Sequence, residues 1–447
     1  MTLSKEDLEN TLITLANIPA QKDASLGYLP AILFTKWAAD KADEPGFLES
    51  IGAETTPVYD TDLRPKELVS QLIKEPATFP ANQEEICVGI EDPRDVRHHF
   101  EVLKHTIRTL GIFQIGEMQT EDVRDAFDAY LDQMFSLSRH GIYSFQPNAA
   151  DIISRIAGKT AEAYDPFCKT GEILCAVDAG KRTGSEPNPA FNTIAHVRSC
   201  FQGKRIEMAD DPISAPLTNA DGSLRKFPLV VSNINSDIIL HRHPEKNPAV
   251  SMDIHGRFSL CPDAEVVDSR IMLLHALACT EDTGRCIVVS PSINDGGIRN
   301  LRPAERTQLL ENDWLEAVIQ IPASNRTTEL SLIRELRIMV FNKNKDQNRK
   351  GKVLFINAEE CTEEARDKIC RTFEDYAEIP GYAGIVDLNV VIKDRKGDLN
   401  PQSHTAVLGI PKALDLAEAR QELIKIEGKR LVVLTDILDL LEEMKTE

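Results

Sequence analysis

Long apolar runs are missing from this chain of 447 residues. A membrane-spanning helix needs about 18 or more consecutive apolar residues, and no such stretch occurs. The first residues are acidic, and no basic start precedes an apolar core, so no secretory signal is expected. We therefore expect a cytoplasmic protein that has no membrane partner.

Metal-type spacing of cysteine is also missing. The nine cysteines are scattered. Cys168 and Cys175, like Cys279 and Cys286, stand seven apart with no pair of histidines to complete a zinc site. The neighbouring His241 and His243 have no nearby pair of acidic residues and favour a solvated loop. We expect reduced, mostly buried thiols and no metal.

Positive charge is scarce. The chain has 51 Lys and Arg against 71 Asp and Glu, a formal net charge of −20. Because neutralisation of phosphates by Lys and Arg supplies most non-specific affinity for nucleic acid, this balance argues against a self-sufficient DNA-binding protein. It leaves open a subunit whose partner provides the DNA contacts, or a basic concave face on an acidic body.

The pattern along the chain predicts three parts. Residues 1–140 have the helical spacing of apolar positions, with helices that begin near Leu26 and cover 96–110 and 120–138, and with Pro30 tolerated in the first turn of its helix. The Pro-containing residues 75–80 are expected to form a loop. Residues 346–447 form an appendix with a strand at 352–357 and helices at 413–427 and 431–444.

Between these parts, residues 141–345 predict an α/β domain. Short apolar runs alternate with helical segments, which indicates a mostly parallel sheet covered on both faces. The last two runs lack an intervening helix and are expected to pair antiparallel at the edge. The predicted strands are 161–165, 227–232, 285–290, 315–321 and 336–341.

Residues 164–174 (YDPFCKTGEIL) form a strand end, a polar turn with one glycine and a helix start. Such a turn directs backbone N–H groups and a helix N-terminus at a ligand. A turn of this kind is common, and a purely structural role is an equal alternative.

Several segments together resemble one family. Residues 165–171 (DPFCKTG) resemble an Asp-Pro-x-Cys-Gly-Thr-Gly cofactor motif, 143–147 (YSFQP) a Phe-Tyr-Thr-Pro element, and 284–291 (GRCIVVSP) a Gly-Arg-x-x-x-Val-x-Pro strand. They occur in the order found in the modification (M) subunit of type I restriction–modification systems, which methylates adenine N6 in DNA and serves in phage defence. Further matching segments extend the resemblance over nearly the whole chain: 258–260, 268–277, 309–322, 340–345 and 398–401.

The resemblance implies the class I S-adenosylmethionine-dependent methyltransferase fold. This fold is a Rossmann-like, mostly parallel seven-stranded sheet, here with an N-terminal helical domain and C-terminal helices. The cofactor would be S-adenosylmethionine, with Asp165, Thr170 and Gly171 shaping the pocket for its methionine end. Lys169 replaces the first glycine of the motif, and its side chain either blocks the cofactor or points outward.

The remaining cofactor-binding residues also follow from the resemblance. Phe145 and Pro147 match the upstream element in type. The acidic residue after the second strand accepts hydrogen bonds from the ribose hydroxyls in this family, and Glu207 is the candidate, with an exposed Glu as the alternative. Asp221 resembles the acid near the adenine ring, and an ordinary Asp-Gly turn is its alternative.

The catalytic motif is altered. Residues 227–236 (FPLVVSNINS) stand where the family has its catalytic Asn-Pro-Pro-Phe. In the family, the Asn side chain and a Pro carbonyl hold the adenine amino group, and the aromatic residue stacks on the extruded base. Asn233 is kept, whereas Ile234, Asn235 and Ser236 replace the rest. The lost stack and acceptor correspond to about 3–6 kcal/mol of transition-state stabilisation, or rates on the order of 10² to 10⁴ lower. Phe258 is a possible substitute for the aromatic residue.

Three functions follow as hypotheses. The first is an M-subunit relative with reduced or lost catalysis, a pseudoenzyme that acts in a DNA-binding complex with a specificity subunit and either a restriction/translocase subunit or a second M-type subunit. The second is an active adenine-N6 DNA methyltransferase with an atypical motif. The third is a nucleotide-binding regulator that does not act on DNA.

Overall fold

The computed structural model describes residues 4–16, 28–73, 93–137, 147–234, 246–292, 295–323, 335–394 and 396–405. Residues up to Thr405 form one compact unit. The predicted helices at 413–427 and 431–444 lie outside the described residues, as does the predicted loop at 75–80. The division at residues 140 and 345 stays a prediction.

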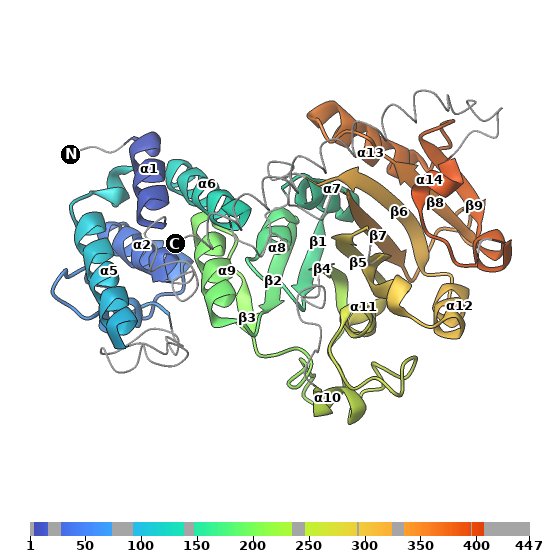
Figure 1. The fold of residues 1–447 in the computed structure, drawn as a ribbon, viewed down its shortest axis with the longest axis horizontal. Coiled ribbons are helices and arrows are strands. Elements are labelled where there is room, and N and C mark those ends of the chain that lie inside the picture. Colours follow the sequence, from blue (N-terminus) through green and yellow to red (C-terminus); the bar gives the residue numbers. More distant parts are fainter. Residues whose placement is uncertain are drawn as a thin grey trace, which may run out of the picture. The chain divides into compact units, whose positions relative to one another are not determined.

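A nine-stranded sheet in the order β3-β2-β1-β4-β5-β7-β6-β8-β9 organises the described chain (Figure 1). Strands β1 to β5 run parallel, β7 is antiparallel to both of its neighbours, β8 is parallel to β6, and β9 is antiparallel to β8. The strands are β1 (Thr160–Asp165), β2 (Ala179–Ser185), β3 (Glu207–Ala209), β4 (Phe227–Asn233), β5 (Thr280–Pro291), β6 (Leu315–Pro322), β7 (Glu335–Asn342), β8 (Lys352–Asn357) and β9 (Ala383–Asp387).

The five predicted strands are present, but the predicted number of seven strands is too low. β6 and β7 pair antiparallel as expected. Their predicted place at the edge is wrong, because β7 also pairs with β5 and β6 also pairs with β8. Residues 352–357, assigned to an appendix from the sequence, thus extend the sheet, and β9 closes that side.

Apolar side chains alternate between the two faces of the sheet. On β4, Leu229 and Val231 join one core cluster and Val230 joins the other. The first cluster includes residues of α7, α8 and α13, and the second includes residues of α11 and α12. Successive side chains of a strand point to opposite faces of the sheet, and both faces are buried here. The strands are therefore apolar at nearly every position. These helices are α7 (Pro147–Ala157), α8 (Glu172–Ala176), α11 (Ser269–Ala278), α12 (Pro303–Glu311) and α13 (Glu363–Asp375).

The N-terminal helices build a third core cluster together with α9 (Pro189–Phe201). Phe201 of α9 lies with ring centroids 4.9 Å from Trp37 and 5.3 Å from Phe127. The predicted helices occur as α2, α5 and α6, with Pro30 in the first turn of α2. The N-terminal helices are α1 (Lys5–Ala16), α2 (Tyr28–Asp40), α3 (Phe47–Ser50), α4 (Pro65–Val69), α5 (Pro93–Gly111) and α6 (Thr120–Leu137).

The remaining helices are short. They are α10 (Pro248–Ser251), α14 (Pro401–Thr405), the 3₁₀ turns at Ile115–Glu117 and Asp295–Asn300, and a π-helical turn at Val390–Asp394. No helix among the described residues is long and apolar enough to cross a bilayer.

Candidate functional site

Three neighbouring parallel strands bring polar residues to one edge of the sheet. β1 ends at Asp165, β2 is followed by Glu186, and β4 ends at Asn233. β1 lies between the other two, with Asp165 opposite Gly184 and Tyr164 opposite Val230. The order of the strands reverses at β1. β2 and β3 lie on one side of β1, whereas β4 and β5 lie on the other. The carboxyl edge at such a switch point is the usual ligand site of open α/β sheets.

The turn after β1 is tightly held. The buried Asp165 carboxylate accepts the N–H of Phe167 at 3.0 Å, and the N–H of Cys168 donates to the Ser185 carbonyl of β2 at 3.0 Å. The N–H of Gly171 donates to the Cys168 carbonyl at 2.7 Å. The strand-turn-helix segment predicted from the sequence is therefore present, although its helix α8 is only five residues long.

Gly171 is required by its surroundings. Its φ of +72° lies in the left-handed region, which favours glycine. A Cβ at this position would lie 3.1 Å from Ala195 on α9 and 3.1 Å from Ile206. A side chain at this position would therefore crowd α9 and Ile206 and would also need the strained left-handed backbone.

Lys169 also takes a left-handed backbone, with φ of +49°. This conformation costs a non-glycine residue on the order of 1–2 kcal/mol, so the glycine of the family motif has a direct physical reason here. The lysine side chain is half-buried, and its charge acts on Asp165. A cationic side chain thus lies close to the buried Asp165 carboxyl.

The Asp165 carboxyl has a strongly shifted pKa. The pKa of Asp165 is raised to about 7, chiefly by burial and also by the charge of the neighbouring Glu186, although the Phe167 N–H, Ser232 and Lys169 act in the opposite direction. Two carboxyl groups, one fully buried, therefore face each other's charge at the ends of β1 and β2. Such a pair favours a cationic ligand, because a nearby positive charge stabilises the ionised form of both groups.

Thr170 is held by a buried arginine on α9. Its carbonyl and its Oγ1 both accept from the Nη1 of Arg198, at 2.7 Å and 2.8 Å. Arg198 is buried on α9 and also donates from Nε to Asp128 of α6 at 3.1 Å. Arg198 and Asp128 could not be found from the sequence, because their role depends on the contact of two helices far apart in the chain.

Asn233 and Ile234 lie at the end of β4. Asn233 is half-buried. The N–H of Ile234 donates to the Val289 carbonyl at 2.8 Å, and the Ile234 side chain is fully buried in the core cluster that also holds Phe167. Ile234 is thus a core residue with a fixed backbone. Asn235 and Ser236 lie outside the described residues, as do His241 and His243.

The structure places the two acidic candidates on β3 and in a turn, and their roles stay predictions. Glu207 belongs to β3, and its exposed carboxylate pairs with Lys181 at 3.1 Å. The position directly after the second strand is held by the buried Glu186, which was not among the residues predicted from the sequence. The available signal was an acid directly after the strand that ends in Gly184-Ser185. Asp221 is exposed in a turn, where it accepts the N–H of Ser223 at 2.9 Å.

The two aromatic candidates do not supply an exposed ring among the described residues. Phe145 lies outside them, and Pro147 is the exposed first residue of α7. Phe258 is 3% exposed and packs with its ring 4.7 Å from the Arg257 guanidinium carbon. In this arrangement Phe258 is a core residue and is not presented to a base.

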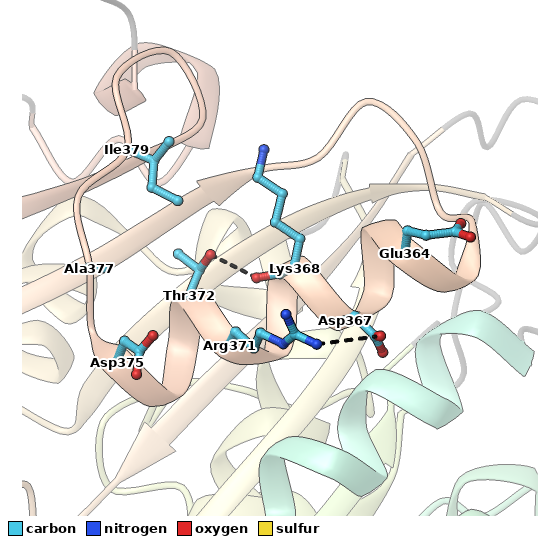
Figure 2. A pocket seen from close by; sticks show the side chains of 8 residues that line it. All are labelled: Glu364, Asp367, Lys368, Arg371, Thr372, Asp375, Ala377 and Ile379. Carbon is cyan, nitrogen blue, oxygen red and sulfur yellow. Dashed lines mark hydrogen bonds and ion pairs between the residues drawn. The ribbon is translucent and has the colours of Figure 1, made fainter.

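A hollow of about 390 Å³ lies on α13, apart from these residues. Figure 2 shows its charged lining, in which Arg371 pairs with Asp367 on the same helix. The lining contains none of the residues at the carboxyl edge of β1, β2 and β4. No cluster of three or more metal-ligating side chains occurs in the described part of the chain.

The family comparison agrees with this geometry. The model of the family described as N-6 DNA Methylase matches residues 145–410, more than half of the chain. The chain belongs to the N-6 DNA methylase family.

Relatives of known type accompany this match. The type I restriction enzyme MjaVII methylase subunit of Methanocaldococcus jannaschii is 24% identical over 380 residues, which cover 77% of this chain and 63% of that protein. The chain thus spans less than two thirds of the length of that relative.

Two solved structures share the fold. The type I restriction–modification methyltransferase subunit of Streptococcus thermophilus has a TM-score of 0.61 at 17% identity, covering 90% of this chain and 99% of that one. A chain from a study of complex assembly in the type I restriction–modification system has a TM-score of 0.57 at 15% identity, covering 98% and 99%. The fold is therefore the class I S-adenosylmethionine-dependent methyltransferase fold, here with two additional strands.

The first prediction concerns the backbone of Lys169. We expect Lys169→Gly to raise the free energy of unfolding by about 0.5–1 kcal/mol, because glycine relieves the left-handed strain at some entropic cost. Lys396→Gly is the matched control, since Lys396 also has a positive φ, of +53°, outside this site. Both variants should be stabilised in denaturant titrations. Destabilisation by Lys169→Gly alone would contradict the strain argument and show that the lysine side chain supports the turn.

The second prediction concerns pH. The pKa of Asp165 rises from 3.8 to about 7 on folding, so the folded state retains a proton that the unfolded state has released. Unfolding then releases a proton between about pH 4 and 7, and the free energy of unfolding should fall as the pH rises through this window. Asp165→Asn cannot ionise and should give a flatter dependence in denaturant titrations across the window. The exposed Asp221→Asn should keep the slope of the wild type, and an unchanged slope in Asp165→Asn would disprove the assignment.

Proposed function

We propose that this chain is an M-subunit-like member of the family that binds S-adenosylmethionine at the carboxyl edge of β1, β2 and β4, with reduced or lost transfer of the methyl group to adenine N6. The observation that carries the proposal is the position of Asn233 and Ile234. Asn233 ends the strand beside the cofactor turn, whereas Ile234 is committed to the core and to the sheet ladder.

The residues present suit the cofactor. Asp165 and Glu186 offer negative charge near its cationic sulfonium and ammonium groups. Gly171 lets the turn after β1 pack closely against α9. The bound cofactor would supply the methyl group. We assign the ribose hydroxyls to Glu186 in place of Glu207, because Glu186 follows the second strand directly. Asp165, Thr170 and Gly171 keep the roles that the motif implies.

Positioning of adenine is the part that the chain lacks. The family holds the amino group between an Asn side chain and the carbonyl of the next residue, and this work is geometric rather than covalent. Asn233 can still accept a hydrogen bond. Phe258, the candidate substitute for the aromatic residue, is buried in the core. We therefore place the protein in a DNA-binding complex in which a specificity subunit provides target recognition, consistent with the net charge of −20.

The alternative function is an active methyltransferase with an atypical motif. The retention of a half-buried Asn233 at the end of β4 favours it. In this alternative, Asn233 would hold the amino group, and residues after Ile234 would supply the stacking surface.

A cofactor titration tests the first half of the proposal. We expect Glu186→Gln to weaken S-adenosylmethionine binding about 10-fold or more, because a carboxylate that accepts from two hydroxyls contributes about 1.5–3 kcal/mol. Glu207→Gln, an exposed carboxylate in an ion pair, should stay within about twofold of the wild type. Calorimetry gives both affinities. The assignment is wrong if Glu207→Gln causes the larger loss, and the cofactor role itself fails if the wild type shows no binding.

A methyl-transfer assay tests the second half. With tritiated S-adenosylmethionine, unmodified DNA and the partner subunits present, we expect transfer on the order of 10² to 10⁴ slower than an intact motif would give. Asn233→Ala should then change little. Robust transfer that disappears in Asn233→Ala would reject the loss of catalysis and establish the alternative.

A further inference from the structure

Arg198 connects the turn after β1 to the N-terminal helices. It is 1% exposed, and its guanidinium forms three hydrogen bonds to acceptors on two other segments. Two go to the carbonyl and Oγ1 of Thr170 in the cofactor turn, and the third goes to Asp128. The Asp128 side chain is 22% exposed and lies on α6, among the N-terminal helices.

α9 contacts both of these parts. Phe191, Ile194, Val197 and Phe201 belong to the core cluster of the N-terminal helices. Ala195 and Arg198, three residues apart and therefore on one side of the helix, meet the turn at Gly171 and Thr170. A displacement of α6 would thus leave a buried guanidinium with fewer partners, which is costly, and would loosen the backbone around Gly171.

We infer that Arg198 is a positioning residue through which the packing of the N-terminal helices sets the rigidity of the cofactor turn. The charged bonds to both oxygens of Thr170 fix the peptide that precedes the left-handed Gly171. Because coupling between two sites is reciprocal, a ligand on the turn would in turn strengthen the docking of α6. The part of this inference that concerns the cofactor rests on the proposed function.

Asp128→Asn tests the coupling without truncating the buried arginine. It weakens the α6 end of the link and leaves the Thr170 bonds possible. Glu162→Gln is the matched control, because Glu162 lies on β1, pairs with Arg225 at 2.6 Å and has a similar side-chain exposure of 21%. Glu162 makes no hydrogen bond to the turn among the described residues.

The first readout is hydrogen exchange in the absence of cofactor. We expect Asp128→Asn to speed exchange at the Cys168 and Gly171 amides about 5- to 10-fold, whereas Glu162→Gln stays within about twofold of the wild type. Arg198→Lys keeps the charge but lacks the planar fork that reaches all three acceptors, and it should speed exchange at least as much. Equal acceleration in Asp128→Asn and Glu162→Gln, or none in Asp128→Asn and Arg198→Lys, would overturn the inference.

The second readout is S-adenosylmethionine affinity by calorimetry. Asp128→Asn should bind about fivefold more weakly than the wild type, and Glu162→Gln should match the wild type. Wild-type affinity in Asp128→Asn would overturn the coupling to the cofactor. If the wild type does not bind the cofactor, the proposed function fails, while the exchange measurement still decides whether Arg198 positions the turn.

Discussion

Parallel pairing of β1 with β2 on one side and β4 on the other is the constraint on which the site depends. This pairing places Asp165, Glu186 and Asn233 at one edge although they are far apart in sequence. It also brings the Ser185 carbonyl within reach of the Cys168 N–H, so the turn after β1 is tied to its neighbour. The electrostatic properties of this region, including the raised pKa of Asp165, follow from the burial of polar groups at the ends of these strands.

The strands and the turn after β1 could be predicted from the sequence because their signals are local. A run such as residues 227–232 is apolar on both faces, and residues 165–171 carry their own turn chemistry. The number of strands could not be predicted from the sequence. The local pattern of residues 352–357 predicts a strand but does not indicate whether that strand joins the sheet. Its parallel pairing with β6 is a tertiary choice.

The candidate site residues show the same difference between local signals and tertiary contacts. Asp165 and Gly171 were named from a motif, and each has a physical reason for its identity here: burial for the acid and a left-handed, crowded backbone for the glycine. Glu207 was predicted as the acid after the second strand. Only the observed end of β2 shows that Glu186 occupies that position. Arg198 and Asp128 carry no motif at all, because an ion pair between two helices has no sequence signature.

Ile234 has a consequence for how this chain changes over evolutionary time. A proline there would remove the N–H that the Val289 carbonyl accepts and would replace a fully buried branched side chain with a smaller ring. A single Ile234→Pro substitution would therefore lower stability. Compensating changes around Phe167 and Val289 would have to accompany a proline at this position.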